Sequence, residues 1–83
     1  MMNITIGFEY EAKQLGMQLR LMRHTKHRTL RETAESTGLS ISYLSDLERG
    51  RRLPSIAALK RICAYYGVAA EVTPARVDFI LAK

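Results

Sequence analysis

Apolar side chains recur at every second position near the start of the chain. The alternating positions hold Ile4, Ile6, Phe8 and Tyr10. A period of two is typical of a strand with one apolar face, so the pattern predicts a short β-strand over residues 3–10. A single strand cannot satisfy its own backbone N–H and C=O groups. The expected partner is the C-terminal segment or a second subunit.

From Leu15 the apolar spacing changes to that of a helix. Leu15, Leu19 and Met22 lie at i, i+4 and i+7, which places them on one stripe of a helix. Basic side chains occupy the other faces, and the basic run from His24 to Arg28 follows the last apolar position. The pattern therefore predicts a helix that ends near this run.

Two short helices are predicted next. Thr29 and Glu32 have the spacing of a capping box, which predicts a helix from Leu30 to about Thr37. Gly38 can take the left-handed conformation that ends such a helix. Ser40 is an expected N-cap for a second helix, which runs from Ile41 to about Arg49.

A fourth helix is predicted after the loop that contains Pro54. Ser55 is its expected N-cap, and its expected apolar face consists of Ile56, Leu59, Ile62, Cys63 and Tyr66. Thr73 and Pro74 resemble the start of a fifth helix. Residues 77–81 fit either a short helix or a strand.

These elements predict an all-α bundle of four or five helices, with a short N-terminal β-strand attached. Residues 13–68 are expected to form the helical domain. Residues 1–12 are an expected N-terminal strand or arm, and residues 69–83 are an expected C-terminal helix or strand. Both end segments are expected to take part in dimerisation, because Ile4, Ile6, Phe8 and Tyr10 exceed what a four-helix core needs.

Charge changes the picture because it is localised. The chain has 83 residues and a formal net charge of +5. Ten basic and four acidic residues lie between Arg20 and Arg61, whereas the remainder of the chain is slightly acidic. A localised basic field favours a polyanion, most commonly nucleic acid. The alternative is a basic surface that is merely solvated.

Other classes of function have little support. A chain of this size buries only about 60% of the surface of its unfolded form, so a deep catalytic pocket is hard to build. No Ser-His-Asp set or Gly-rich phosphate loop is visible. His24, His27 and Cys63 are too few for a metal site, and Cys63 is expected in the core. We therefore expect no enzymatic activity, no cofactor and no metal.

Location is also constrained by the sequence. A single cysteine cannot form an internal disulfide. The first residues lack the pattern of a signal peptide, and no apolar stretch approaches the ~18 residues of a membrane span. The expected location is the cytoplasm, at the nucleoid when bound to DNA, with no membrane partner.

The residues between Thr29 and Glu48 describe a helix-turn-helix, which is two short helices joined by a turn that contains glycine. The first helix crosses the DNA backbone and the second enters the major groove, which is about 12 Å wide. Small and apolar residues must fill the junction, and Ala34, Leu39, Leu44 and Leu47 suit it. The outward face of the second helix is then polar.

Residues 15–68 resemble the Cro/repressor-type helix-turn-helix family, which is also described as XRE-like or lambda-repressor-like. The matching positions are Leu19, Arg20, Arg23, Thr29, Glu32, Ala34, Gly38, Leu39, Ser40, Leu44, Ser45, Leu47, Glu48, Gly50, Pro54, Ser55, Leu59 and Val68. The resemblance implies sequence-specific binding of double-stranded DNA, usually by a homodimer on a palindrome.

The resemblance also implies roles for individual residues. The positions that contact base edges are Ile41, Ser42, Ser45 and Asp46. The positions that contact phosphates are Thr29, Ser40, Tyr43, Arg49 and Arg51, and Arg52 joins them because it lies beside the recognition helix. An alternative for Tyr43 is packing against the fourth helix. Arg23 and Glu48 occupy positions that form a partly buried ion pair between the first and third helices.

The chain departs from the family pattern at several positions. Leu30 stands where glutamine is frequent, and Thr33 stands where leucine is frequent. The groove-facing set lacks the glutamine, asparagine or arginine that makes bidentate base contacts. Ile41 can contact a thymine methyl group. Asp46 can accept from a cytosine amine, or it can pair with Arg49 or Arg52 instead, and DNA shape then contributes to specificity.

The predicted function is transcriptional regulation, most often repression at a promoter. One alternative is an antitoxin that also regulates its own operon and binds a toxin partner, which a neighbouring toxin gene would favour. An alternative of another class is a protein-interaction module whose helix-turn-helix no longer binds DNA. The short side chains on the recognition helix favour that reading, whereas Arg49, Arg51 and Arg52 argue against it.

Overall fold

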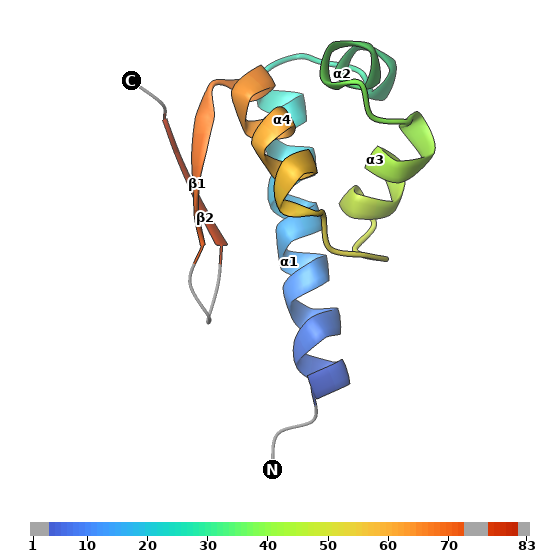
Figure 1. The fold of residues 1–83 in the computed structure, drawn as a ribbon, viewed down its shortest axis with the longest axis vertical. Coiled ribbons are helices and arrows are strands. Elements are labelled where there is room, and N and C mark those ends of the chain that lie inside the picture. The colour runs from blue at the N-terminus through green and yellow to red at the C-terminus, as the bar shows by residue number, and fades with distance from the viewer. Residues whose placement is uncertain (1–3, 73–76, 82–83) are drawn as a thin grey trace.

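The computed structural model describes the backbone of residues 4–72 and 77–81 and the side chains of residues 11–70. Along the described chain the elements are α1 (Ile4–Thr25), α2 (Leu30–Thr37), α3 (Ile41–Glu48), α4 (Ile56–Tyr66), β1 (Val68–Val72) and β2 (Val77–Leu81). In Figure 1, α4 lies beside the upper half of α1, α2 and α3 lie to one side of this pair, and the two strands lie to the other. The predicted all-α helix-turn-helix bundle is confirmed.

The predicted N-terminal strand is wrong. Residues 4–10 form the first turns of α1, which continues without a break to Thr25. A helix satisfies its own backbone groups, whereas a strand needs a partner. Each residue added to an existing helix also gains one hydrogen bond without a new nucleation cost. The helical segment that begins near Leu15 therefore extends backward, despite the alternating side chains.

The two short helices begin and end as the sequence predicts. Thr29 Oγ1 accepts a hydrogen bond from the Glu32 amide at 3.0 Å, and the Thr29 amide donates to Glu32 Oε1 at 2.9 Å. This capping box opens α2. Gly38 ends it with φ +74°, and its amide donates to Ala34 O at 2.9 Å. Ser40 then caps α3 by accepting from the Tyr43 amide at 3.0 Å.

α4 also follows the prediction, with one exception. Ser55 caps it by accepting from the Ala58 amide at 3.1 Å. Its buried residues are Ala58, Leu59, Ile62, Cys63 and Tyr66. Ile56 is not among them, because its side chain is 63% exposed, so its predicted place on the apolar face is wrong. Burial raises the pKa of the Cys63 thiol, which keeps it protonated.

Residues 77–81, which fitted either a helix or a strand, form strand β2. β1 and β2 are antiparallel, with Val68 paired with Leu81 and Val72 paired with Val77. β1 is the strand that contacts α4, and Val68 packs against the core. The suggested helix start at Thr73 and Pro74 lies outside the described residues.

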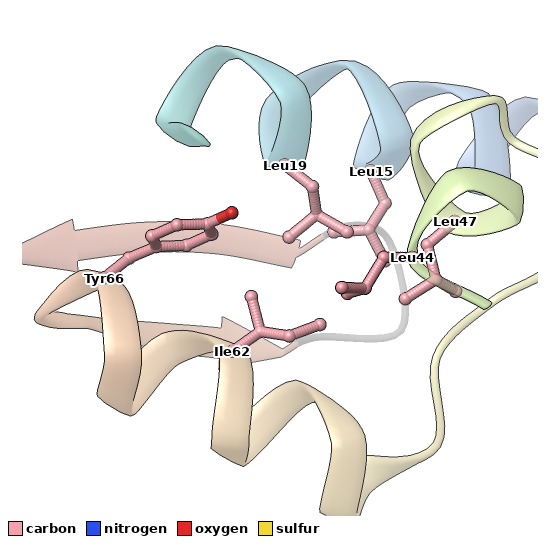
Figure 2. Close-up of a cluster of buried hydrophobic side chains, with 6 residues drawn as sticks. All are labelled: Leu15, Leu19, Leu44, Leu47, Ile62 and Tyr66. Carbon is pink, nitrogen blue, oxygen red and sulfur yellow. The ribbon is translucent and has the colours of Figure 1, made fainter. Parts of the chain in front are cut away.

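The core lies where α1, α3 and α4 meet, as Figure 2 shows. It consists of Leu15, Leu19, Leu44, Leu47, Ile62 and Tyr66. Thr33, at a position where the family often has leucine, is 1% exposed. Its hydroxyl donates to Thr29 O at 3.0 Å and lies 3.3 Å from the Tyr66 hydroxyl. Because the Thr33 proton is already used, Tyr66 is the donor in the second contact, and both polar groups are satisfied.

Among the helices of the described residues, none combines the length and the apolar character needed to cross a membrane.

Candidate nucleic-acid interface

α3 is held close to α1 at a glycine contact. A Cβ atom at Gly16 would overlap the carbonyl oxygen of Leu47 and lie 2.8 Å from that of Glu48. Gly50 has φ +73°, and a Cβ atom there would lie 2.7 Å from Lys13 Cα. Both contacts involve backbone atoms, so the C-terminal end of α3 can approach α1 only because these two residues lack side chains. The approach determines where α3 lies.

An ion pair reinforces this contact. Arg23 Nε donates to Glu48 Oε2 at 2.7 Å, and Arg23 Nη2 donates to Glu48 Oε1 at 3.0 Å. The two side chains are 13% and 6% exposed. Arg23 also donates to Arg28 O at 2.9 Å, and Arg20 Nε lies 3.5 Å from Glu48. The hydrogen bonds with Glu48 raise the pKa of the Arg23 guanidinium, so the pair stays charged. This is the pairing between α1 and α3 that the resemblance implies.

The outer side of α3 is partly open and carries three polar side chains and one apolar side chain. Ile41 and Ser42 are exposed, and Ser45 and Asp46 are half-buried. The spacing i, i+1, i+4 and i+5 places these four residues on one side of the helix. The structure therefore brings together the four residues that the resemblance assigns to base contact.

Asp46 pairs with a residue that the sequence did not suggest. Its Oδ1 lies 3.6 Å from Arg51 Nη1, and its carbonyl accepts from the Arg51 amide at 2.9 Å. The predicted partners were Arg49 and Arg52. The turn after α3 instead folds residue 51 back toward the helix. The Asp46 side chain is 34% exposed, so the carboxylate remains accessible to solvent.

The hydroxyl groups of the two N-cap residues, Thr29 and Ser40, can each donate one further hydrogen bond. Thr29 and Ser40 are exposed, and each hydroxyl already accepts from a backbone amide. A hydroxyl also has a proton to donate. Both groups can therefore donate to an anion while they continue to cap their helices.

Tyr43 links α3 to the start of α4. Its hydroxyl accepts from the Ser55 amide at 3.1 Å, and its ring packs against the core. The guanidinium carbon of Arg52 lies 4.8 Å from the ring centroid, which is within cation–π range. Tyr43 therefore does pack toward α4, and its hydroxyl proton is still free to donate to a phosphate.

A shallow depression of about 690 Å³ lies between the beginnings of α3 and α4. Its lining consists of Gly38, Leu39, Ser40, Ser42, Tyr43, Asp46, Arg52, Ser55, Ala57, Ala58 and Arg61. Three serine hydroxyls and two guanidinium groups, against the one carboxylate of Asp46, favour an anion there. Arg49 and Arg51 are exposed and lie close in sequence to Arg52, so they add further positive charge to this region.

Sequence reasoning missed Arg61 and Gly16, and it named Gly50 without its close contact with α1. Arg61 lies one turn into α4 and reaches the depression only because α4 starts beside α3. Gly16 and Gly50 place α3, and an isolated glycine within a helical pattern was an available signal for Gly16. Among the described residues, no three His, Cys, Asp or Glu side chains gather in a way that could hold a metal ion.

Known proteins are similar to this chain over the segment that contains the helix-turn-helix. The family model described as "Helix-turn-helix domain" matches residues 14–75. An uncharacterized HTH-type transcriptional regulator of Mycobacterium tuberculosis is 40% identical over 65 residues, which are 78% of this chain and 46% of that protein. The chain thus spans about half the length of this relative.

Two further relatives extend the comparison. The ImmF control region 10 kDa protein of Bacillus phage phi105 is 44% identical over 52 residues, which are 63% of this chain and 58% of that protein. The crystal structure of the clp gene regulator ClgR from Corynebacterium glutamicum has a TM-score of 0.65 at 45% identity. It matches 68% of this chain and 60% of its own chain. By the match to three-quarters of its length, this chain belongs to the helix-turn-helix domain family.

Proposed function

We propose that this protein is a transcriptional regulator that binds double-stranded DNA through α3. The observation that carries the proposal is the contrast between the two sides of that helix. Its inner side is held by Gly16 and by the Arg23–Glu48 pair. Its outer side is polar and lies beside Arg49, Arg51 and Arg52. A rigidly held helix with a polar outer face and a basic surround suits the major groove.

Individual contacts follow from this docking. The base edges would be contacted by Ile41, Ser42, Ser45 and Asp46. The phosphates would be contacted by Thr29, Ser40, Tyr43, Arg49, Arg51 and Arg52. The serine side chains are short, so base contacts alone offer limited discrimination, and sequence-dependent DNA shape contributes to specificity.

The finer proposal is a repressor that binds a palindromic operator as a homodimer. Two copies of α3 would occupy half-sites about one helical turn apart, which is about 34–36 Å. Occupation of a promoter would exclude the polymerase, and the protein would act in the cytoplasm at the nucleoid. The phage relative named as an ImmF control region protein is compatible with repression. The division into an arm, a DNA-binding domain and a C-terminal segment remains a prediction.

Selection from a pool of random duplexes tests the function. The selected duplexes are sequenced, and affinity is measured at two salt concentrations. A palindromic consensus with weaker binding at high salt supports the proposal, because phosphate contacts release counterions. Binding without sequence preference contradicts it and points to an architectural role. Absence of binding at low salt favours a protein-interaction module, and a bound product of a neighbouring toxin gene favours an antitoxin.

The mass of the protein in solution tests the homodimer. Sedimentation equilibrium should give a mass twice that of the chain at concentrations where DNA binds. Deletion of residues 1–10 is expected to lower the dimer fraction. A dimer unchanged by the deletion would exclude these residues from the interface, and a monomer on a half-site would contradict the homodimer.

A further inference from the structure

Arg52 is held by an aromatic ring, although it lies in an exposed loop. Its guanidinium carbon is 4.8 Å from the centroid of the Tyr43 ring. Among the residues whose side chains are described, no carboxylate forms an ion pair with Arg52, whereas Arg51 next to it pairs with Asp46. The two neighbouring cations of this loop are therefore restrained in different ways, one by a carboxylate and one by a ring.

The Tyr43 side chain is itself restrained at two points. It packs against the core cluster, and its hydroxyl accepts from the Ser55 amide at 3.1 Å. Ser55 is the N-cap residue of α4, so the Tyr43 side chain links α3 to α4. Because the Tyr43 ring is fixed to two helices, it can hold the flexible Arg52 side chain in one place. Arginine also stacks on aromatic faces better than lysine does, because its charge is spread over a planar group.

We propose that Tyr43 is a positioning residue, whose ring holds the Arg52 guanidinium over the depression between α3 and α4 for a phosphate of bound DNA. The proposal rests on the proposed function. It replaces the direct phosphate contact proposed above for Tyr43 with a contribution of the Tyr43 ring, which acts through Arg52.

The physical gain is preorganisation. A free arginine side chain loses much rotamer freedom when it binds a phosphate, and this loss weakens binding. Stacking on Tyr43 removes part of that freedom before DNA arrives. Arg52, Ser40 and Ser42 all line the same depression. The charge is thus held beside two hydroxyl groups that can donate to the same anion.

A double-mutant cycle on the full chain tests the coupling, with a selected duplex as the probe. In the wild-type background, Arg52→Gln should reduce the slope of log affinity against log salt by about 0.9, the value for one lost phosphate contact. In a Tyr43→Phe background the same reduction is expected, because the ring remains. In a Tyr43→Leu background Arg52→Gln should have little further effect, because Arg52 is no longer held. Arg51→Gln is the matched control and should cost the same factor in all three backgrounds.

The outcomes separate this proposal from the function on which it rests. If the wild type binds DNA and Arg52→Gln costs the same factor with and without the ring, the positioning role is overturned and the function stands. If Tyr43→Phe alone lowers affinity as much as Arg52→Gln does but leaves the salt slope unchanged, the neutral hydroxyl contacts phosphate directly and the proposal is overturned. If the wild type does not bind, both fail.

A measurement without DNA keeps the proposal testable even if Tyr43→Leu does not fold. The δ protons of Arg52 should resonate upfield of those of the neighbouring Arg51, which pairs with Asp46, because of the ring current of Tyr43. The shift should persist in Tyr43→Phe. A normal shift in the wild type would overturn the proposal.

Discussion

The two sides of α3 differ in burial and in their contacts with the rest of the chain. The inner side carries Leu44 and Leu47, which are 4% and 1% exposed, and contacts α1 at the backbone of Gly16. The outer side carries Ser42, which is exposed, and Asp46, whose side chain is 34% exposed and pairs with the exposed Arg51. Eight residues therefore serve two purposes, because successive positions on a helix face different directions.

This difference predicts how substitutions on each side of α3 affect stability and DNA binding. Changes on the inner side disturb packing and a buried charge, so they should lower the free energy of unfolding. Changes on the outer side remove no buried contact, so they should alter DNA binding with little effect on stability. Four predictions test this division between the two sides of α3.

The largest effect is expected at the buried ion pair. Glu48→Ala would leave the Arg23 guanidinium, only 13% exposed, without its carboxylate. Loss of one partner of a buried pair costs about 3–5 kcal/mol of unfolding free energy. Denaturant unfolding measures it. The control is Asp46→Ala, which breaks the exposed pair with Arg51 and should cost less than about 1 kcal/mol. Equal costs for the two variants would contradict the division.

The second prediction concerns the glycine contact. Gly16→Ala places a methyl group against the carbonyl oxygens of Leu47 and Glu48, which are backbone atoms and cannot turn aside. Overpacking of this kind costs about 1–3 kcal/mol. In an open helix Gly→Ala would stabilise the protein. Gln14→Ala, on the exposed side of α1, is the control that introduces an alanine without overpacking, and it should change the unfolding free energy by no more than about 0.5 kcal/mol. Thermal unfolding of both variants measures the difference, and a more stable Gly16→Ala would refute the close approach.

The third prediction concerns the outer side. Arg49 is exposed at the C-terminal end of α3. Arg49→Gln should change the unfolding free energy by no more than about 0.5 kcal/mol. It should also lower the salt slope of DNA binding by about 0.9, equally for all duplex sequences. Binding titrations on two unrelated duplexes measure this. A loss confined to one sequence would indicate a base contact instead.

The smallest effect is expected at the capping box of α2. The backbone hydrogen bond from Thr29 lowers the pKa of Glu32 below its usual value of 4.5. A lowered pKa in the folded state means that the charged form is favoured by folding. This stabilisation is therefore present above pH 4.5 and is lost as the pH falls through the lower value in the folded protein.

Comparison with a neutral variant isolates the contribution of Glu32. Wild type and Glu32→Gln are unfolded thermally between pH 7 and pH 3. The wild type should have the slightly higher melting temperature at pH 7, and the difference should shrink below about pH 4.5. A difference that does not change with pH would exclude the charge of Glu32 as its cause.

The helical core was predictable because its signals are local. Thr29, Gly38, Ser40 and Ser55 act on amides or dihedral angles within three or four residues of themselves. These signals placed α2 and α3 within one residue of their observed bounds, and they placed the start of α4. The alternation between Ile4 and Tyr10 was misleading, because a strand depends on a partner that no local pattern specifies. The Val77–Leu81 segment remained ambiguous for the same reason, and its pairing with Val68–Val72 resolved it.

Local patterns in the sequence were enough to establish the helix-turn-helix, its caps and the polar residues on the outer face of α3, because periodicity and capping operate over a few residues. The contacts between distant segments depended instead on how the chain packs. These include Gly16 against Leu47, Arg52 on Tyr43, and Asp46 with Arg51 rather than Arg49 or Arg52. Such contacts depend on how close two helices approach and how a loop folds back. The packing of the whole chain sets these distances, and the spacing of residues along it does not.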